Sequence, residues 1–353
     1  MSRTGEFLLG TSAINMIDGD LETFWSSPPH DFPQSIVITL GARARIDRVG
    51  FRSLPGFFGA KTVQFDRSLD GATWQPLATM QSKSVDVAQW LNVPPVEATY
   101  LKVTIPDAAT PGHDTRLQSI LAHGTEVSPR NDPSLAGCWS VNGSAVTFAQ
   151  HGSRAAGVLA LGTQPVFLDG ATNGRLWRFN WIRGNDYGLT ALTVSPDGKH
   201  LSAIEWHEEA IPLFRSRPWF GERSSCSAPG LRDDVTVAVL KRAGHVSLFG
   251  LRFDPSGQLL ADASREELQS LAKILRAAPP LEIVAHEFRQ PDSKRNQEVA
   301  QREIDSVKTA LMSVGASLEH TTFRAAGSDN PRHVPASDVA RAIYSRIEAE
   351  VRR

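Results

Sequence analysis

The chain has 353 residues, with 37 Lys and Arg against 38 Asp and Glu and a formal net charge of −1. A chain of this length seldom folds around one core, so we expect two or three domains. The absence of a net positive charge disfavours binding to nucleic acid or to an acidic membrane surface. With 41% hydrophobic and 21% charged residues, the composition excludes a largely disordered chain.

Two further features bear on where the chain resides. It has no run of eighteen apolar residues, so we expect no transmembrane segment. Residues 1–10 lack the basic start and the apolar stretch of a secretory signal peptide. This absence leaves open that the chain is a mature fragment behind a new Met.

Residues 1–127 predict an all-β domain. Short β-type runs alternate with turn residues, and aliphatic side chains take alternate positions over 35–40 and over 100–105. We expect these runs to form an antiparallel sandwich. Residues 128–133 contain two prolines and no apolar residue, which predicts an exposed linker and a domain boundary.

Residues 128–235 keep the β pattern and form the predicted second domain. Five of the eight tryptophans lie here, and Trp177, Phe179 and Trp181 alternate with polar neighbours. Such aromatics favour the core of a small antiparallel sheet or barrel over a ligand cleft. The run from Ala136 to Trp139 is similar to the start of lipocalin-like barrels. This resemblance implies a barrel fold and says nothing about a ligand.

Residues 236–353 change to a mixed α/β pattern and form the predicted third domain. Ser264 and Glu267 have the spacing of a capping box, so we expect a helix to begin directly after Ser264. We also expect a buried strand, a second helix and a half-exposed last strand, over residues 281–285, 300–314 and 347–351.

Three spaced motifs in the first domain carry a family resemblance. They are an Asp-Gly-Asp segment over 17–27, a Ser-Leu-Asp-Gly segment over 68–74, and two closing runs over 100–103 and 117–124. Together they resemble a discoidin, or coagulation-factor type C, domain of the galactose-binding-like class. The resemblance implies a jelly-roll β-sandwich.

The Asp-Gly-Asp segment is a candidate metal site. Asp18, Asp20 and Thr23 offer closely spaced oxygens, and family members often hold Ca²⁺ in this loop. Here Ser119 takes the position of an acidic residue that the family usually has near its last strand. Two interpretations stay open, a structural Ca²⁺ or side chains that only cap a turn, and we expect no other cofactor.

The resemblance also implies a shallow glycan site on loops at one rim, where an aromatic ring stacks on a sugar and Arg or His binds its hydroxyls. By loop position the candidates are His30, Phe32, Arg52, Phe57, Phe58, His113 and Arg116. The adjacent phenylalanines lie in a loop rich in Gly and Pro. Either they are exposed and contact a ligand, or the loop folds onto the sandwich edge. A membrane-inserting spike is disfavoured, because no basic cluster surrounds them.

The third domain is similar to the OmpA-like family, a module that grips peptidoglycan in the bacterial periplasm. The resemblance rests on residues 253–260, the strand end at His286, Asn296, Asn330-Pro331, Arg341-Ala342 and residues 346–348. It implies a location in the bacterial periplasm or cell envelope, at the outer membrane. Such an oxidising location favours a disulfide between Cys138 and Cys226 over two free thiols.

The expected peptidoglycan site is degenerate. Where the family has an Asp and an Arg that pair with diaminopimelate, this chain has Phe288 and Glu303. Loss of both partners disfavours ordinary peptidoglycan binding. A rescue by Glu287 and Arg302, each one residue earlier, would need a shifted backbone. The residues of this degenerate site are His286, Glu287, Phe288, Asn296, Arg302 and Glu303.

No motif in the sequence predicts catalysis. The His and Glu residues over 200–209 lack the spacing of a metal site, and no nucleophile, phosphate-loop or dinucleotide motif occurs. We therefore expect a non-enzymatic envelope scaffold whose first domain binds a glycan or envelope polysaccharide and whose third domain contacts a protein. Two alternatives stay open, a glycan- or wall-processing enzyme with a catalytic middle domain, and a structural module that binds only proteins.

Overall fold

The computed structural model describes residues 2–3, 13–17, 24–127, 133–160, 163–172, 176–195, 197–207, 217–225, 234–254, 256–277, 280–288, 292–329 and 345–352. The chain divides into two compact units. The first holds residues 1–133 with two short segments, 194–204 and 210–220. The second holds the rest of the middle region together with the C-terminal region.

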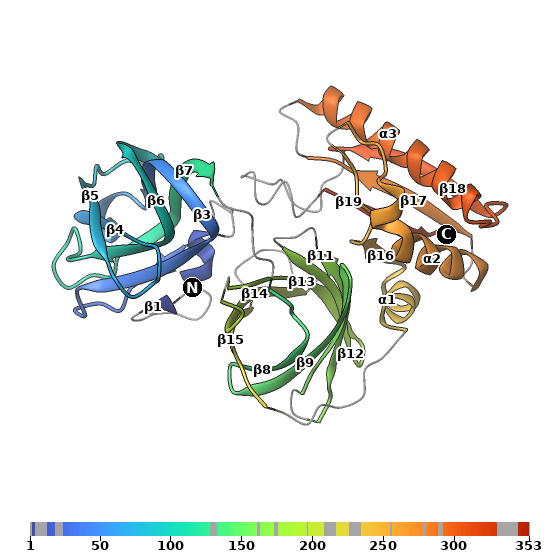
Figure 1. Cartoon of the computed structure of the whole chain (residues 1–353), viewed down its shortest axis with the longest axis horizontal. Helices are drawn as coiled ribbons and strands as arrows, with labels where there is room; N and C mark the ends of the chain where they lie inside the picture. Colours follow the sequence, from blue (N-terminus) through green and yellow to red (C-terminus); the bar gives the residue numbers. More distant parts are fainter. Residues whose placement is uncertain are drawn as a thin grey trace. The chain divides into compact units, whose positions relative to one another are not determined.

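The N-terminal region folds as the predicted β-sandwich (Figure 1). Its strand order is β2-β7-β3-β6-β4-β5, with β1 paired to β3. Strands β3 and β6 are long, and register shifts interrupt their pairing. Such shifts bend a strand, so that one strand can contribute to both layers of the sandwich. The strands are β1 (Ser2–Arg3), β2 (Trp25–Ser26), β3 (Gln34–Ser53), β4 (Thr62–Ser68), β5 (Gln75–Gln81), β6 (Gln89–Ile105) and β7 (Arg116–Glu126).

The alternating aliphatic positions fill the sandwich core as predicted. Ile36, Val103 and Ile105 are fully buried, and they pack with Trp25 and Phe51. Two short 3-10 turns, η1 (Ala13–Met16) and η2 (Gly56–Phe58), complete the described part of this domain.

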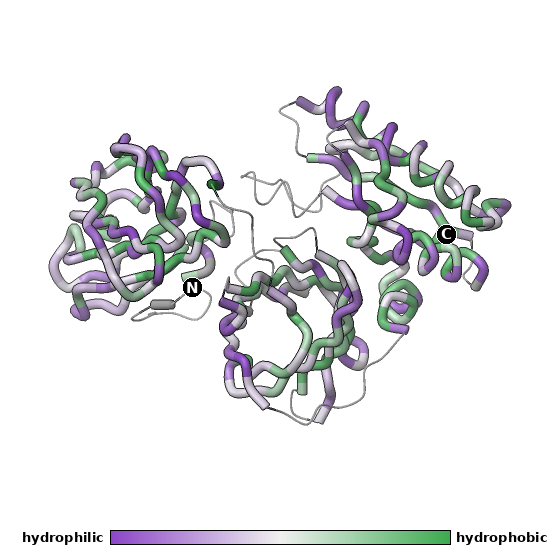
Figure 2. The backbone as a smooth tube through the Cα atoms, in the orientation of Figure 1, coloured by the Kyte–Doolittle hydropathy of each residue, from purple (hydrophilic) through white to green (hydrophobic). Residues whose placement is uncertain are grey.

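The middle region forms a closed eight-stranded barrel, which agrees with the predicted small β domain (Figure 1). Figure 2 shows polar and apolar residues alternating along its strands. The strands are β8 (Gly137–Val141), β9 (Ser144–His151), β10 (Arg154–Leu159), β11 (Val166–Thr172), β12 (Trp177–Arg183), β13 (Asp186–Val194), β14 (His200–His207) and β15 (Arg217–Arg223).

Aromatic side chains pack the barrel interior. Trp177, Phe179 and Trp181 alternate along β12 and are all buried. The Phe179 ring lies 5.5 Å from Phe148 and stacks on Trp177 at 6.0 Å. Trp139, also buried, donates its indole N–H to the Leu135 carbonyl at 2.9 Å. The predicted aromatic core is confirmed for these residues.

The C-terminal region is a four-stranded sheet with helices. The strand order is β16-β19-β17-β18, and only β17 and β18 run parallel. Strand β16 therefore lies at an edge of this sheet. The elements are α1 (Val235–Ala243), β16 (His245–Leu248), α2 (Ala261–Ala277), β17 (Leu281–His286), α3 (Ser293–Ser313), β18 (Thr321–Gly327) and β19 (Arg346–Val351).

Two predictions for this region are wrong in detail. Helix α2 begins at Ala261, so Ser264 lies inside the helix and does not cap it; its Oγ instead accepts a hydrogen bond from the Arg252 backbone N–H at 2.8 Å. The last strand is not half-exposed, because β19 lies between β16 and β17 and buries Glu348 completely. The predicted buried strand and second helix are confirmed by β17 and α3.

Some predictions fall on residues that the structure does not describe. Cys226 lies outside the described residues, so its disulfide with Cys138 on β8 stays a prediction. Residues 330–344, which include two of the expected OmpA-like motifs, also lie outside the described residues. None of the helices in the described ranges is long and apolar enough to cross a bilayer.

Candidate functional site

Two loops of the sandwich come together at one rim. The first joins β3 to β4 and contains η2, and the second joins β6 to β7. The Ala109 N–H donates to the Gly59 carbonyl at 3.0 Å, and Ala60 forms a β-bridge with Ala108. The Leu54 N–H donates to the Arg116 carbonyl at 3.1 Å. These backbone contacts hold the two loops in a fixed arrangement.

Four predicted glycan-binding residues meet at this rim. The Phe57 and Phe58 rings lie 5.9 and 6.2 Å from the ring of His113. The Arg116 guanidinium stands 3.6 Å above the centre of the Phe58 ring, close enough for a cation–π contact. Phe57 is 68% exposed, whereas Phe58 is half-buried. Each alternative for this loop therefore applies to one ring: Phe58 folds onto the rim and Phe57 faces outward.

His30 adjoins the same rim. It is exposed and has a positive φ of 62°, and its ring lies against Gly112. Gly112 itself has a φ of +84°, and a Cβ there would come within 2.9 Å of the His30 ring. Only glycine fits this position without moving His30. The five residues Phe57, Phe58, His113, Arg116 and His30 are called the rim cluster from here on.

A buried carboxylate anchors the rim cluster. Asp114 Oδ2 accepts hydrogen bonds from Arg116 Nε at 2.8 Å and from Ser26 Oγ at 2.5 Å. Burial acts to raise the pKa of Asp114, but the hydrogen bonds from Ser26 and Arg116 and the Arg116 charge outweigh it and lower that pKa. Asp114 and Ser26 are not among the residues predicted from the sequence. The Asp two residues before Arg116 was the only local signal for this anchor.

The remaining two candidates have other surroundings. Arg52 Nε donates to Asp86 Oδ1 at 2.9 Å, and the nearby Gly56 N–H donates to Ser84 Oγ at 2.8 Å. Arg52 therefore joins β3 to the loop after β5, and the Gly56 bond joins that loop to the loop that carries Phe57. Phe32 is half-buried and packs against the sandwich core, which leaves little of its ring for stacking on a ligand.

The two sequence motifs of this domain differ in what the structure shows. Asp18, Asp20 and Thr23 lie outside the described residues, so the Ca²⁺ site stays a prediction. In the second motif, Asp70 Oδ1 accepts hydrogen bonds from the Thr73 and Ala72 N–H groups and from Ser68 Oγ, at 2.7, 2.9 and 2.8 Å. These bonds lower the pKa of Asp70 well below its usual value. The motif thus builds a turn.

The six residues of the expected degenerate site have different surroundings. Phe288 and Glu303 are both buried. Arg302 is exposed and donates through Nε to the Ser256 carbonyl at 2.5 Å, while buried Glu287 accepts from Ser345 Oγ at 3.1 Å. The structure thus gives Arg302 and Glu287 separate partners. The remaining two predicted residues, Asn296 and His286, are buried at the start of α3 and the end of β17.

One group in the described ranges has the composition of a metal site. His286, Glu348 and Glu350 each place a donor atom within 4.8 Å of the others. Arg346 Nε lies 3.0 Å from Glu348 Oε1, and Arg324 lies 3.6 Å from Glu350. Because these guanidinium groups already neutralise the carboxylates, we assign no metal to this group.

Comparison with known proteins identifies the first domain. The F5/8 type C domain family matches residues 2–117. No curated protein matches the chain. Among solved structures, the C-terminal domain of a chitobiase from Bacteroides fragilis is 28% identical, with 36% of this chain and 93% of that chain covered and a TM-score of 0.33.

Two further solved structures come from Clostridium perfringens. CBM32-3 of a family 31 glycoside hydrolase is 19% identical over 35% of this chain and 89% of its own, with a TM-score of 0.32. The family 32 module of NanJ, in complex with galactose, is 18% identical over 34% of this chain and 90% of its own, with a TM-score of 0.31. The match of the F5/8 type C family to residues 2–117 supports the domain that the spaced motifs predicted.

Proposed function

We propose that this chain is a non-catalytic scaffold of the bacterial cell envelope that binds a glycan through its F5/8 type C domain. The exposed Phe57 ring beside His113 and Arg116 is the observation that carries the proposal. A sugar ring presents C–H groups on one face and hydroxyls at its edge. An aromatic ring flanked by cationic and polar side chains complements both features.

Each residue of the rim cluster has a distinct role in this proposal. Phe57 stacks on the apolar face of the sugar. Arg116 uses Nε for Asp114, which leaves its two terminal nitrogens to donate to sugar hydroxyls. His113 lies against Phe57 and supplies a ring nitrogen at the edge of the stack. Because this site is an open rim, we expect weak affinity per site and gains from multivalent display.

The C-terminal domain has a different role in the scaffold. We expect it to contact a protein or an altered wall component instead of an ordinary stem peptide. The burial of Phe288 and Glu303 supports this expectation, because the positions where a stem peptide would need an anion and a cation hold an apolar ring and a carboxylate. The aromatic packing of the barrel interior supports a role without catalysis.

A glycan array tests the proposal on the full chain, with and without Ca²⁺. We expect saturable binding to a defined set of glycans, and loss of that binding in Phe57→Ala. Leu69→Ala is the matched control, since Leu69 is an exposed apolar side chain at the opposite end of β4 from the Phe57 loop. An array without signal, or equal binding by both variants, would contradict glycan recognition at this rim.

A further inference from the structure

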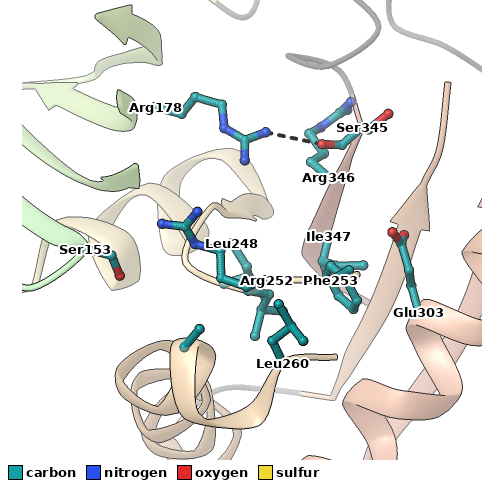
Figure 3. A pocket seen from close by; sticks show the side chains of 12 residues that line it. Ser153, Arg178, Leu248, Arg252, Phe253, Leu260, Glu303, Ser345, Arg346 and Ile347 are labelled. Carbon is teal, nitrogen blue, oxygen red and sulfur yellow. Dashed lines mark hydrogen bonds between the residues drawn. The ribbon is translucent and has the colours of Figure 1, made fainter. Parts of the chain in front are cut away.

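The second compact unit contains a cavity whose lining residues the proposed function does not use. A cavity of about 500 Å³ lies where Arg178 of β12 and Ser153, the residue before β10, meet residues of the α/β part, among them Ala263 of α2 and Arg346 of β19 (Figure 3). Its volume is in the range of small-molecule pockets. The barrel contributes Ser153 and Arg178, and the α/β part contributes the rest of the lining.

Specific contacts hold the two walls of this cavity together. Arg154 on β10 forms an ion pair with Asp169 on β11 at 2.9 Å and another with Glu267 on α2. Ile182 of β12 belongs to the same hydrophobic core as the sheet and helices of the α/β part. The cavity is therefore a feature of the folded unit, shaped by both parts.

Positive charge dominates one side of the cavity. Arg178, Arg252 and Arg346 line it, with Glu303 as the acidic lining residue. Arg346 has an ion pair with Glu348, and Arg178 donates to the Ser345 carbonyl at 3.2 Å. Figure 3 shows Glu303 across the cavity from Arg178 and Arg252.

Arg252 is the residue that points to a ligand. Within the described ranges its guanidinium has no ion pair, and its buried Nε has no hydrogen-bond partner. Burial lowers the pKa of Arg252. A half-buried cation without an anion is costly, because it has lost water without gaining a partner. An anionic group in the cavity would supply that partner.

Much of the remaining lining is apolar. It comprises Leu248, Leu251, Phe253, Leu260, Ala263 and Ile347. A fully solvated inorganic ion would leave this apolar surface uncovered, whereas an organic body would bury it. We infer that this cavity binds an organic anion, a carboxylate or phosphate monoester with a small apolar body. Arg252 and Arg178 bind the anionic group, and Glu303 repels a second one.

The inference is tested by isothermal titration calorimetry on the full chain with four six-carbon probes: hexanoate, hexyl phosphate, hexylammonium and hexanol. We expect an anionic probe to bind and the cationic and neutral probes not to bind. Tighter binding of hexanoate assigns a carboxylate ligand, and tighter binding of hexyl phosphate assigns a phosphate monoester. Binding of hexanol as tight as that of the anions, or no binding of either anion, would overturn the inference.

Substitutions in the cavity test whether the anionic probe binds there. Arg252→Gln should weaken the affinity for the anionic probe by about 10- to 100-fold, which is the usual effect of losing a charge-assisted hydrogen bond. Arg276→Gln, at an exposed Arg on α2, is the matched control and should bind as the parent does. Glu303→Gln should strengthen binding. If Arg252→Gln does not fold, Leu260→Trp fills the cavity from its apolar side and should abolish binding. Unchanged affinity in a folded Arg252→Gln or Leu260→Trp would refute the assignment.

Discussion

The Asn180 side chain on β12 forms two hydrogen bonds with the backbone of Ser247 on β16. Asn180 Nδ2 donates to the Ser247 carbonyl at 2.8 Å, and the Ser247 N–H donates back to Asn180 Oδ1 at 3.3 Å. Strand β16 is at the edge of its sheet, where backbone groups have no neighbouring strand. The amide therefore takes the place of a strand residue and covers this edge.

Replacing Asn180 by Ala should loosen β16 locally. Both backbone groups of buried Ser247 would lose their partner, which costs about 1 to 3 kcal/mol for each unsatisfied group. We expect faster hydrogen exchange at the Ser247 amide, measured by mass spectrometry on peptides covering 245–248. Asn92→Ala, at an exposed position of β6, should leave this exchange unchanged. Equal exchange in Asn180→Ala and the parent would show that the amide does not protect the edge.

The ion pairs of Arg154 predict a second, larger effect. Arg154→Ala would leave Asp169 and Glu267 close together without a cation, and breaking a buried pair in this way costs about 3 to 5 kcal/mol. We expect a lower unfolding midpoint of the C-terminal unit in denaturant. Arg183→Ala is the control, because its ion pair with Asp186 is at the surface and contributes little.

The loss in Arg154→Ala should depend on pH. Burial already raises the pKa of Glu267, and removal of Arg154 would raise it further. A carboxyl group with a raised folded-state pKa stabilises the fold below its unfolded pKa and loses this contribution as the pH rises. The variant should therefore recover part of its stability between pH 7 and pH 4. Denaturation midpoints that fall in parallel for variant and parent would contradict this.

Sequence patterns predicted the burial in this protein better than its polar contacts. Alternation placed Trp177, Phe179 and Trp181 in the barrel core, because a strand exposes its two faces to different surroundings. The capping-box spacing of Ser264 and Glu267 misplaced a helix start. Both side chains instead bind groups that are distant in sequence, Arg252 and Arg154, and a local pattern carries no information about such partners.

The rim cluster illustrates the same limit. The family resemblance located Phe57, His113 and Arg116 by their loops, and the structure brings them together. The anchor of Arg116 joins Asp114 to Ser26, which is 88 residues away in sequence. Arg252 gave no sequence signal, because its significance comes from a cavity that only the fold creates, where its Nε has no hydrogen-bond partner among the described residues.

Asp114 predicts how the rim cluster responds to mutation. Asp114→Asn keeps an acceptor for Arg116 but removes the charge, which weakens the hydrogen bond by about 1 kcal/mol and the glycan affinity by about fivefold. Titration of the best array ligand measures this change. Asp107→Asn is the control in the same loop, since Asp107 forms a half-exposed ion pair with Lys61. If Asp114→Asn and Asp107→Asn bind the glycan with equal affinity, Asp114 does not contribute to glycan binding.

The lowered pKa of Asp114 determines the pH range in which this residue stabilises the sandwich. Its hydrogen bonds favour the ionised form in the folded state, so the folded pKa lies below the unfolded one. The contribution of Asp114 to stability is then fully present above the usual Asp range and is lost only as the pH falls through the lowered value. The stability difference between parent and Asp114→Asn should stay constant from pH 7 to pH 5 and shrink at more acidic pH. A difference that vanishes already at pH 5 would place this pKa above, not below, its usual value.

The resemblance of residues 236–353 to the OmpA-like family is an expectation from the sequence, and it predicts a negative result in a peptidoglycan-binding assay. In that family diaminopimelate pairs with an anion and a cation, whereas the corresponding residues expected here are Phe288 and Glu303, which are buried, and exposed Arg302 donates to the Ser256 carbonyl. The purified chain should stay in the supernatant when peptidoglycan sacculi are sedimented, while an OmpA-like domain with the usual Asp and Arg should sediment with them. Saturable sedimentation that Arg302→Ala abolishes would show instead that Arg302 replaces the missing Arg. Sedimentation that Arg302→Ala leaves unchanged but Phe57→Ala abolishes would place the contact on the rim cluster, where the glycan strands of the wall would be the ligand.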